Sequence, residues 1–411
     1  MVLETHSMKV LIFNTLYYPY QIGGAERSVQ LLAESLKNGG CEVTVVTLHE
    51  GNKIEKMIHN GVNVIKLPLS NFYWPWGESQ NGLTKLLWHL YDIYNVKMRK
   101  VIEAVLKDKT YDVVHTNNLC GFSVAVWNWA EKQGLPIVHT ARDYYLLNPN
   151  AKLFRKGKNH SPRTVDSILF SFLKKINSSK VTQFVGISHY IKDLHVDNEF
   201  FKDDISSVIY NSIAVREVAM QRNKIYRKGE EVVLGYLGRI EDNKGIEFLL
   251  SSLERIGIDI FTLLVAGKGD AKYISFLKER YSKVSFEFVG TVNVVDFFPD
   301  IDYLIVPSLW HEPFGRVVVE ANSCGIPVIA SNRGGIPEII VEGETGFVFD
   351  AENDSSLVEL LQEIALLERQ KYELISMNAF VFSRRFNSEK VMNEYMEIYR
   401  KAIKVNNSAT F

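Results

Sequence analysis

The amino-acid sequence predicts an α/β protein made of two Rossmann-like domains. Its length of 411 residues exceeds that of an ordinary single domain. Short apolar strands alternate with amphipathic helices in one series before residue 215 and in a second series after residue 231. The polar stretch 216–230 separates the two series and is predicted to be a linker. We therefore expect domains at 8–215 and 231–385, followed by a C-terminal helix within 386–411.

Composition excludes several classes of protein. Apolar residues make up 46% and charged residues 23% of the chain, as in globular proteins. A net charge of -1 argues against a nucleic-acid binder. Cys41, Cys120 and Cys324 are far apart, which predicts free thiols and no metal site. The N-terminus lacks a signal-peptide pattern and no run of about eighteen apolar residues occurs. We expect a cytoplasmic protein.

The first βαβ unit has an incomplete nucleotide-binding pattern. A buried strand at 9–13 leads through a loop to a helix at 25–37 and a second strand at 42–48. The loop carries only Gly23 and Gly24, whereas a dinucleotide fingerprint needs three spaced glycines and a later acid. This makes a nicotinamide or flavin enzyme the weakest alternative. The glycine pair indicates either a plain tight turn or a backbone approach to a phosphate at a helix N-terminus.

An aromatic segment and a long amphipathic helix follow. Trp74 and Trp76 flank a proline, and apolar residues recur at helical spacing over 83–106. We expect one helix packed on the sheet. The alternative is an acceptor-facing wall, because aromatic rings stack on sugars. On this second interpretation, Trp74 and Trp76 are candidates for acceptor binding.

Two further predicted strands, 111–115 and 136–140, each end in a histidine. His115 and His139 are therefore candidates for the ligand-binding edge of the sheet, although a lone histidine is more often structural. Beyond them, the segment 151–180 holds eight Lys or Arg residues against the single acid Asp166. It indicates either a solvated loop and helix or a basic patch that contacts an anionic membrane or a phosphate-bearing acceptor.

In the second series, cations follow the first strand. Arg239 ends the strand 232–237, and Lys244 stands just before the next helix. Cations placed there can neutralise a leaving diphosphate without a metal ion, although isolated residues of this kind are ordinary surface charges. Gly267 follows the strand 261–266 and fits a turn that lets a nucleotide pass close to the backbone.

The stretch 306–344 carries the strongest pattern of the chain. A strand at 301–307, a loop, a helix at 314–324 and a strand at 327–330 form a βαβ unit. Glu312 lies in the loop, and Glu320 lies eight residues later within the helix. Ligands bind such units at the carboxyl ends of the strands, and the free amides at Phe314 and Gly315 suit a diphosphate.

These residues resemble a known family. The string EPFGRVVVE, followed by GIPVIAS and GGIPE, is similar to the donor-site motif of the retaining GT-B glycosyltransferases of family 4. The resemblance covers residues 9–403 and is weakest over 70–109 and 151–180. It implies two facing Rossmann-like domains, with the donor mostly on the second domain, the acceptor on the first, and a cleft between them. It also implies that the C-terminal helix within 386–411 crosses back to the first domain, although packing within the second domain would give the same amphipathic pattern.

The resemblance also implies roles for individual residues. Glu312 would bind hydroxyls of the donor sugar and Glu320 the ribose, while Arg239 and Lys244 would clamp the phosphates. Within HTARDYY, His139 would contact the transferred sugar, and Asp143 would orient it or meet the acceptor. Many relatives carry a histidine followed directly by Asp or Ser, whereas Ala141 and Arg142 intervene in this chain.

The expected activity is transfer of a sugar with retention from a nucleoside-diphosphate sugar, UDP- or GDP-linked, to an acceptor hydroxyl. No metal or cofactor is expected. The expected partners are the nucleotide sugar, a glycan or lipid-linked acceptor of polysaccharide or glycolipid assembly, and the inner face of an anionic membrane through 151–180. The alternatives are an epimerase or phosphorylase on the same fold, and a non-catalytic scaffold of a glycan-assembly complex.

Overall fold

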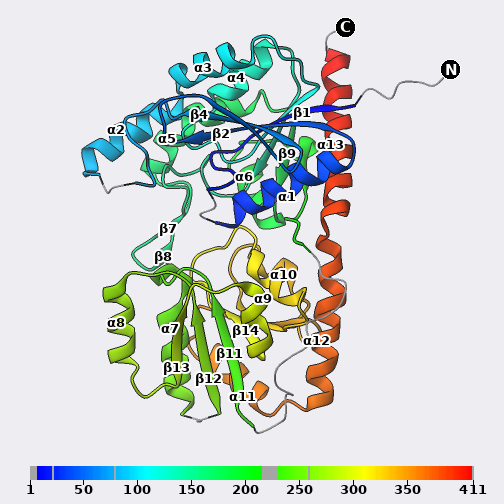
Figure 1. The fold of residues 1–411 in the computed structure, drawn as a ribbon. Helices are drawn as coiled ribbons and strands as arrows, with labels where there is room; N and C mark the ends of the chain where they lie inside the picture. Colours follow the sequence, from blue (N-terminus) through cyan, green and yellow to red (C-terminus); the bar gives the residue numbers. More distant parts are fainter. Residues whose placement is uncertain (1–6, 21–22, 78–79, 215–229, 258–259, 410–411) are drawn as a thin grey trace, which may run out of the picture. The chain divides into compact units, whose positions relative to one another are not determined.

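The structure is a computed structural model, and the part it describes comprises residues 7–20, 23–77, 80–214, 230–257 and 260–409 (Figure 1). The chain forms two compact units. Unit 1 contains Met1–Leu153, Ser161–Ser212 and Ser388–Phe411, and unit 2 contains Phe154–His160 and Ile213–Asn387. The predicted linker 216–230 lies outside the described residues except for its last position. Both units are α/β, as the sequence predicts.

Unit 1 is built on an eight-stranded sheet in the order β10-β9-β6-β5-β1-β2-β4-β3. All neighbouring strands are parallel except β3 and β4. The central strand β1, KVLIF, is almost fully buried because helices cover both faces of a parallel sheet. The strands are β1 (Lys9–Phe13), β2 (Glu42–His49), β3 (Glu55–His59), β4 (Val62–Pro68), β5 (Val113–Thr116), β6 (Ile137–Ala141), β9 (Gln183–Gly186) and β10 (Ser206–Val208).

The helices of unit 1 come from both ends of the chain. The C-terminal helix packs against α1, β5 and β6, and its Tyr395 and Tyr399 belong to the same apolar core as Val10 and Ile12 (Figure 1). Its amphipathic pattern therefore completes the core of the N-terminal half. The helices are α1 (Gly24–Asn38), α2 (Gly82–Ile93), α3 (Val96–Leu106), α4 (Ala125–Lys132), α5 (Val165–Ser178), α6 (His189–Asp197) and α13 (Ser388–Ala409).

The single helix predicted over 83–106 is wrong in two respects. The chain leaves the helical conformation at Tyr94 (φ -149°, ψ 91°), and the Asn95 side chain then caps α3 by accepting a 2.9 Å hydrogen bond from the Met98 amide. The leucines of α2 are also not packed on the sheet. Leu83 is 69% exposed and Leu87 46%, because Trp88, Asp92 and Ile93 form the buried face instead.

The basic segment 151–180 is divided between the two units. Residues Phe154–His160 form a small hairpin that groups with unit 2, whereas α5 belongs to unit 1. Lys174 of α5 is only 3% exposed and donates a 2.7 Å hydrogen bond to the Tyr145 carbonyl. The prediction that Lys174 belongs to a surface patch is therefore wrong.

Unit 2 contains a six-stranded parallel sheet in the order β13-β12-β11-β14-β15-β16. The sequence analysis did not predict β16 or the hairpin β7–β8, whose two strands of two residues each are too short for a periodic pattern. The strands are β11 (Val232–Leu237), β12 (Phe261–Ala266), β13 (Phe286–Gly290), β14 (Tyr303–Val306), β15 (Val328–Ser331), β16 (Gly346–Phe349), β7 (Phe154–Arg155) and β8 (Lys158–Asn159). The helices are α7 (Ile246–Ile256), α8 (Ala271–Arg280), α9 (Val294–Phe297), α10 (Arg316–Asn322), α11 (Ser356–Ala365) and α12 (Arg369–Ser383).

No helix in the described part of the chain is long and apolar enough to cross a membrane.

Candidate functional site

The carboxyl edge of the unit 2 sheet brings two predicted site residues together. β11 and β14 are neighbours in the sheet, so the loops that follow them lie side by side. Lys244 comes from the loop after β11 and Glu312 from the loop after β14. The Lys244 ammonium donates a 2.5 Å hydrogen bond to Glu312 Oε1 and lies 4.9 Å from the centre of the Trp310 ring.

Glu312 is a largely buried carboxylate held in its charged form. Its side chain is 13% exposed, and Ser308 Oγ donates a second hydrogen bond of 2.7 Å to the same oxygen. Burial acts to raise the pKa of Glu312, but the nearby Lys244 charge and the hydrogen bonds from Lys244 and Ser308 outweigh it and lower that pKa. The loop therefore presents an ionised acceptor group at the end of a strand.

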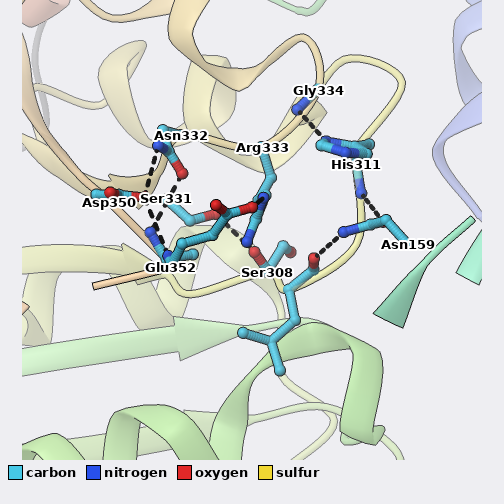
Figure 2. A network of polar contacts seen from close by, with 11 residues as sticks. Asn159, Ser308, His311, Ser331, Asn332, Arg333, Gly334, Asp350 and Glu352 are labelled. Atoms are coloured by element: carbon cyan, nitrogen blue, oxygen red, sulfur yellow. Dashed lines mark hydrogen bonds and ion pairs between the residues drawn. The ribbon is translucent and has the colours of Figure 1, made fainter. Parts of the chain in front are cut away.

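The backbone around Glu312 is fixed by the glycine loop after β15. The Gly335 amide donates a 2.8 Å hydrogen bond to the Glu312 carbonyl, and the Gly334 amide donates one of 3.2 Å to His311 Nδ1 (Figure 2). Gly334 has φ +63°, and a Cβ at this position would lie 2.2 Å from the Glu312 carbonyl oxygen. Only glycine permits this approach, so the GG pair positions the carboxylate.

Glu320 lies on α10, where it forms an ion pair with an arginine of the same helix. Arg316 Nε donates a 2.7 Å hydrogen bond to Glu320 Oε1 one helical turn away. Gly315 opens this helix with φ +89°. The side chain of Phe314 is buried, and its ring contacts that of Phe386 edge to face, with the centroids 6.1 Å apart.

Arg239 and Gly267 lie at the neighbouring strand ends. Arg239 is half-exposed, and its Nη1 donates a 2.8 Å hydrogen bond to Glu241. Gly267 has φ +145°, and a Cβ there would lie 1.7 Å from the Gly238 carbonyl oxygen, so the two loops are in close backbone contact. An open hollow of about 570 Å³ follows the same loops and is lined by Arg239, Ile240, Glu241, Asp242, Lys268, Gly269, Asp270 and Tyr273.

In unit 1, the two candidate histidines are enclosed. His139 is 2% exposed, and its Nδ1 lies 2.9 Å from Thr116 Oγ1. Burial, with a smaller contribution from nearby His195, lowers the pKa of His139 to about 3, so the ring is neutral. Both ring nitrogens of His115 are hydrogen-bonded, to Tyr399 and to Thr140, at 2.8 Å each. These surroundings fit supporting roles.

Arg142 is a residue that the sequence analysis did not select. It follows the end of β6, and its Nε donates a 2.8 Å hydrogen bond to Asn117 Oδ1, while Nη1 donates to Asn211. The neighbouring Asp143 accepts a 2.8 Å hydrogen bond from the Tyr145 amide, and burial raises its pKa to about 6. The carboxyl edge of this sheet thus carries two adjacent ionisable residues, Arg142 and Asp143. Arg142 could have been identified in the sequence by its position directly after a buried strand.

The remaining site residues predicted in unit 1 lie where α1 begins and in the aromatic segment before α2. Gly23 precedes α1, and its amide donates a 2.9 Å hydrogen bond to Glu26 Oε2; Gly24 is the first residue of that helix. Trp74 and Trp76 contact each other edge to face, with ring centroids 4.9 Å apart.

Family comparisons assign both halves of the chain. The model described as Glycosyltransferase Family 4 matches residues 22–217, and the model described as Glycosyl transferases group 1 matches residues 218–382. The chain belongs to the GT-B glycosyltransferases. The second match contains Arg239, Lys244, Glu312 and Glu320, the charged residues of the unit 2 edge.

Relatives of this glycosyltransferase include a protein of a cps region and a capsular polysaccharide biosynthesis glycosyltransferase. A Klebsiella pneumoniae protein, described as an uncharacterized 42.6 kDa protein in the cps region, is 38% identical over 397 residues, which cover 96% of this chain and all of the relative. The capsular polysaccharide biosynthesis glycosyltransferase CapM of Staphylococcus aureus is 24% identical over 251 residues, covering 56% of this chain and 65% of CapM.

Solved structures confirm the fold of the glycosyltransferase. Sucrose-phosphate synthase from Thermosynechococcus elongatus superposes with a TM-score of 0.74 at 18% identity and covers 97% of this chain and 100% of its own. HepE from Anabaena, solved with UDP and glucose, gives a TM-score of 0.67 at 18% identity over 95% of this chain and 98% of its own. The predicted GT-B fold class is therefore confirmed.

Proposed function

We propose that this glycosyltransferase moves a sugar, with retention of its anomeric configuration, from a nucleoside-diphosphate sugar to an acceptor hydroxyl. The observation that carries the proposal is the ionised, largely buried Glu312 paired with Lys244 at the carboxyl edge of the unit 2 sheet. Such an edge is where α/β sheets bind ligands. A carboxylate there can accept hydrogen bonds from sugar hydroxyls, and the ammonium beside it can meet a phosphate.

The chemistry places most charge on the leaving group. The bond between the anomeric carbon and the phosphate oxygen breaks, and its electron pair passes to the diphosphate, while the sugar gains oxocarbenium character. Arg239 and Lys244 stabilise the growing negative charge, so we propose that no metal ion is required. The acceptor oxygen bonds to the anomeric carbon on the same face, and its proton passes to the departing phosphate oxygen. An acid and nucleophile pair of the glycosidase kind is then unnecessary.

In unit 1, we assign the acceptor-facing role to Arg142 and Asp143. They follow the end of β6 at the carboxyl edge of the sheet, where Arg142 is 6% exposed and Asp143 is half-buried. His139 is enclosed two residues before the strand ends, so we assign it a positioning role through Thr116. The neighbouring Asn117 accepts the hydrogen bond from Arg142, which links the enclosed layer to the edge.

The comparisons support a donor and acceptor class. HepE is solved with UDP and with UDP-glucose, so we propose a UDP-linked donor. CapM is named for capsular polysaccharide biosynthesis, and the Klebsiella relative for the cps region. We therefore propose that the acceptor is a glycan or lipid-linked intermediate of surface-polysaccharide assembly.

We also propose that unit 1 contacts the cytoplasmic face of an anionic membrane through α2 and α5, which pack against each other. Both helices leave rows of large apolar side chains exposed, and monomeric proteins rarely expose contiguous apolar surface of this kind without an interaction. The single acid of α2, Asp92, is buried, whereas Lys85 is exposed, which favours anionic lipids. The exposed residues are Leu83, Leu86, Leu87, Leu90, Val165, Ile168, Leu169, Phe172, Leu173 and Ile176.

Thermal denaturation of the protein with UDP, GDP or ADP, in the presence of EDTA, tests the proposed donor. A ligand that binds the native state raises the midpoint in proportion to ln(1 + [L]/Kd), so UDP is expected to raise it and the corresponding UDP-sugar to raise it further. No shift with any nucleotide contradicts the proposal and favours a non-catalytic scaffold. Rapid conversion of the UDP-sugar to an isomer, without an acceptor, identifies an epimerase instead.

A further inference from the structure

The hairpin β7–β8 is a cationic element that the proposed chemistry does not use. It spans Phe154–Asn159 and turns through Lys156 (φ +51°) and Gly157 (φ +73°). Two consecutive residues with positive φ make the tight two-residue turn that matches the twist of the strands. The hairpin is therefore a defined structure within the segment that the sequence suggested could be a solvated loop.

Its register places two cations opposite each other. Phe154 pairs with Asn159, and Arg155 pairs with Lys158. Directly opposed like charges destabilise a pair of strands, so this arrangement is unfavourable for the free hairpin. Alternation along each strand places Arg155 and Lys158 on the face opposite to Asn159. An anion between the two cations would remove the repulsion.

Asn159 anchors the other face of the hairpin next to Glu312. Its Nδ2 donates a 2.8 Å hydrogen bond to the Leu309 carbonyl, and its Oδ1 accepts a 3.0 Å hydrogen bond from the His311 amide (Figure 2). His311 directly precedes Glu312 in the chain. The hairpin is thus tied to the same loop that presents the proposed sugar-binding carboxylate.

The cations surround one hollow. Arg155, Lys156, Lys158 and His160 line a volume of about 500 Å³. Within the part of the chain that the structure describes, no carboxylate forms an ion pair with Arg155, Lys156 or Lys158. Three permanent positive charges exceed what one carboxylate can balance, whereas a phosphoryl group supplies several acceptor oxygens and up to two negative charges.

We propose that the β7–β8 hairpin binds a phosphoryl group carried by the acceptor, an inference that rests on the proposed sugar transfer. The phosphoryl group comes either from a diphosphate that links the glycan to a lipid or from a phosphate monoester within the glycan. The hairpin then selects acceptors by charge, while Arg239 and Lys244 serve the donor.

Calorimetric titration of UDP-saturated full-length protein with inorganic pyrophosphate tests this site. UDP then already occupies the site for the donor's phosphates, so pyrophosphate cannot bind there. Pyrophosphate is expected to bind the wild type. The triple variant Arg155→Gln, Lys156→Gln, Lys158→Gln is expected to bind it at least tenfold more weakly. The matched control Lys272→Gln, Lys278→Gln, Lys283→Gln removes three exposed cations elsewhere in unit 2 and is expected to bind like the wild type. Equal binding by the wild type and the hairpin variant overturns the proposal.

Two further measurements separate the outcomes. Methyl phosphate in place of pyrophosphate distinguishes a monoester from a diphosphate source, and glucuronate binding as tightly as either overturns phosphoryl selectivity. A hairpin variant that keeps its melting temperature but loses UDP binding overturns the proposal, because the hairpin then serves the donor. A further outcome is that neither the wild type nor any variant binds UDP, while only the hairpin variant loses pyrophosphate binding. In that case the sugar-transfer proposal fails and the phosphoryl site stands.

Discussion

Glu312 and Glu320 lie eight residues apart, yet the fold gives each carboxylate different surroundings. Glu312 is largely buried in a loop and bonded to Lys244 from another strand end, whereas Glu320 is 28% exposed on α10 and bonded to Arg316 from its own helix. A carboxylate that depends on a distant loop is fixed in place by the tertiary structure. This difference supports assigning Glu312 to the reacting sugar and Glu320 to the bound nucleotide.

Substitutions at these two positions are expected to separate transfer from binding. Glu312→Ala should leave UDP affinity within a few-fold of the wild type and lower the transfer rate roughly 100-fold or more, as expected for loss of a group that acts in the transition state. Glu320→Gln should weaken UDP binding roughly tenfold, the scale of one hydrogen bond to a charged group. Calorimetry with UDP and a transfer assay measure the two effects.

Glu352→Gln is the matched control for both variants, because Glu352 also pairs with a cation of unit 2, Arg333, but is 76% exposed. This control should change neither the UDP affinity nor the transfer rate. Because Glu312→Ala also leaves Lys244 without its partner, Glu312→Gln is included to keep the side-chain volume. The reverse pattern, with UDP affinity lost at position 312 and kept at 320, contradicts the assignment of roles.

At the scale of single residues, the sequence placed His139 near the end of a strand, whereas β6 continues to Ala141, two residues further. His139 lies within β6 and pairs in register with Phe184, so its ring is enclosed between helices and sheet. Arg142 lies one residue past the end of the strand, where its side chain reaches Asn117 and Asn211. Strand boundaries read from a sequence are uncertain by more than this offset.

At the scale of elements, two strands and one helix of unit 1 each contain a buried neutral histidine. These are His115 on β5, His139 on β6 and His195 on α6. Burial is the largest cause of the lowered pKa of each histidine. It lowers the pKa of His139 to about 3 and that of His195 to about 4, and it lowers the pKa of His115 well below its ordinary value. These three histidines therefore hold fewer protons in the folded state than in the unfolded state across the mildly acidic range, whereas burial raises the pKa of Asp92 to about 7 and that of Asp143 to about 6, which acts in the opposite direction.

The three histidines are consequently expected to lower the stability of unit 1 as the pH falls. The histidines' contribution is fully present above the unfolded pKa of about 6.5 and is lost as the pH falls toward the folded values, at up to about 1.4 kcal/mol per pH unit for each histidine. Urea denaturation at pH 7.5, 6.5 and 5.5 measures the slope. His195→Gln should reduce that slope by about one proton, whereas the exposed His189→Gln should leave it unchanged. An unaltered slope in His195→Gln contradicts this account.

Periodicity predicted the strands of both sheets better than it predicted the environment of the helices. Continuous apolar runs such as KVLIF are buried on both sides in a parallel sheet, so their position follows from composition. Leucines at helical spacing in α2 have the same pattern whether they face a core or a membrane. Burial of Trp88 and Asp92, which decides the orientation of that helix, depends on tertiary contacts that the sequence does not display.

At the scale of the whole molecule, chain order and spatial grouping differ at two places. The C-terminal helix α13 joins unit 1, and the hairpin Phe154–His160 joins unit 2. The family resemblance led us to expect the helix to cross back, whereas its amphipathic pattern also fits packing within the second domain. The hairpin gave no such signal, because its attachment depends on two hydrogen bonds of the single side chain Asn159.

The proposed membrane contact concerns the whole molecule, and the burial of individual side chains decides which variants can test it. Lys174 is buried, so charge reversal there would disturb the fold of unit 1 and say nothing about lipids. The informative variant is Leu86→Ser, Leu169→Ser, Phe172→Ser, which removes exposed apolar groups from α2 and α5. Leu374→Ser, Met377→Ser, Val381→Ser removes similarly exposed groups from α12 of unit 2 and is the matched control.

Cosedimentation with vesicles of anionic and zwitterionic phospholipid measures the contact. The wild type and the α12 control should sediment together with the vesicles. The α2–α5 variant should bind at least tenfold more weakly, because each large apolar side chain at the interface contributes on the order of 1 kcal/mol. Equal sedimentation of all three proteins, or none by the wild type, contradicts a bilayer contact through these helices. If the same substitutions instead convert a dimer into a monomer in size-exclusion chromatography, α2 and α5 pack against a second copy of the chain.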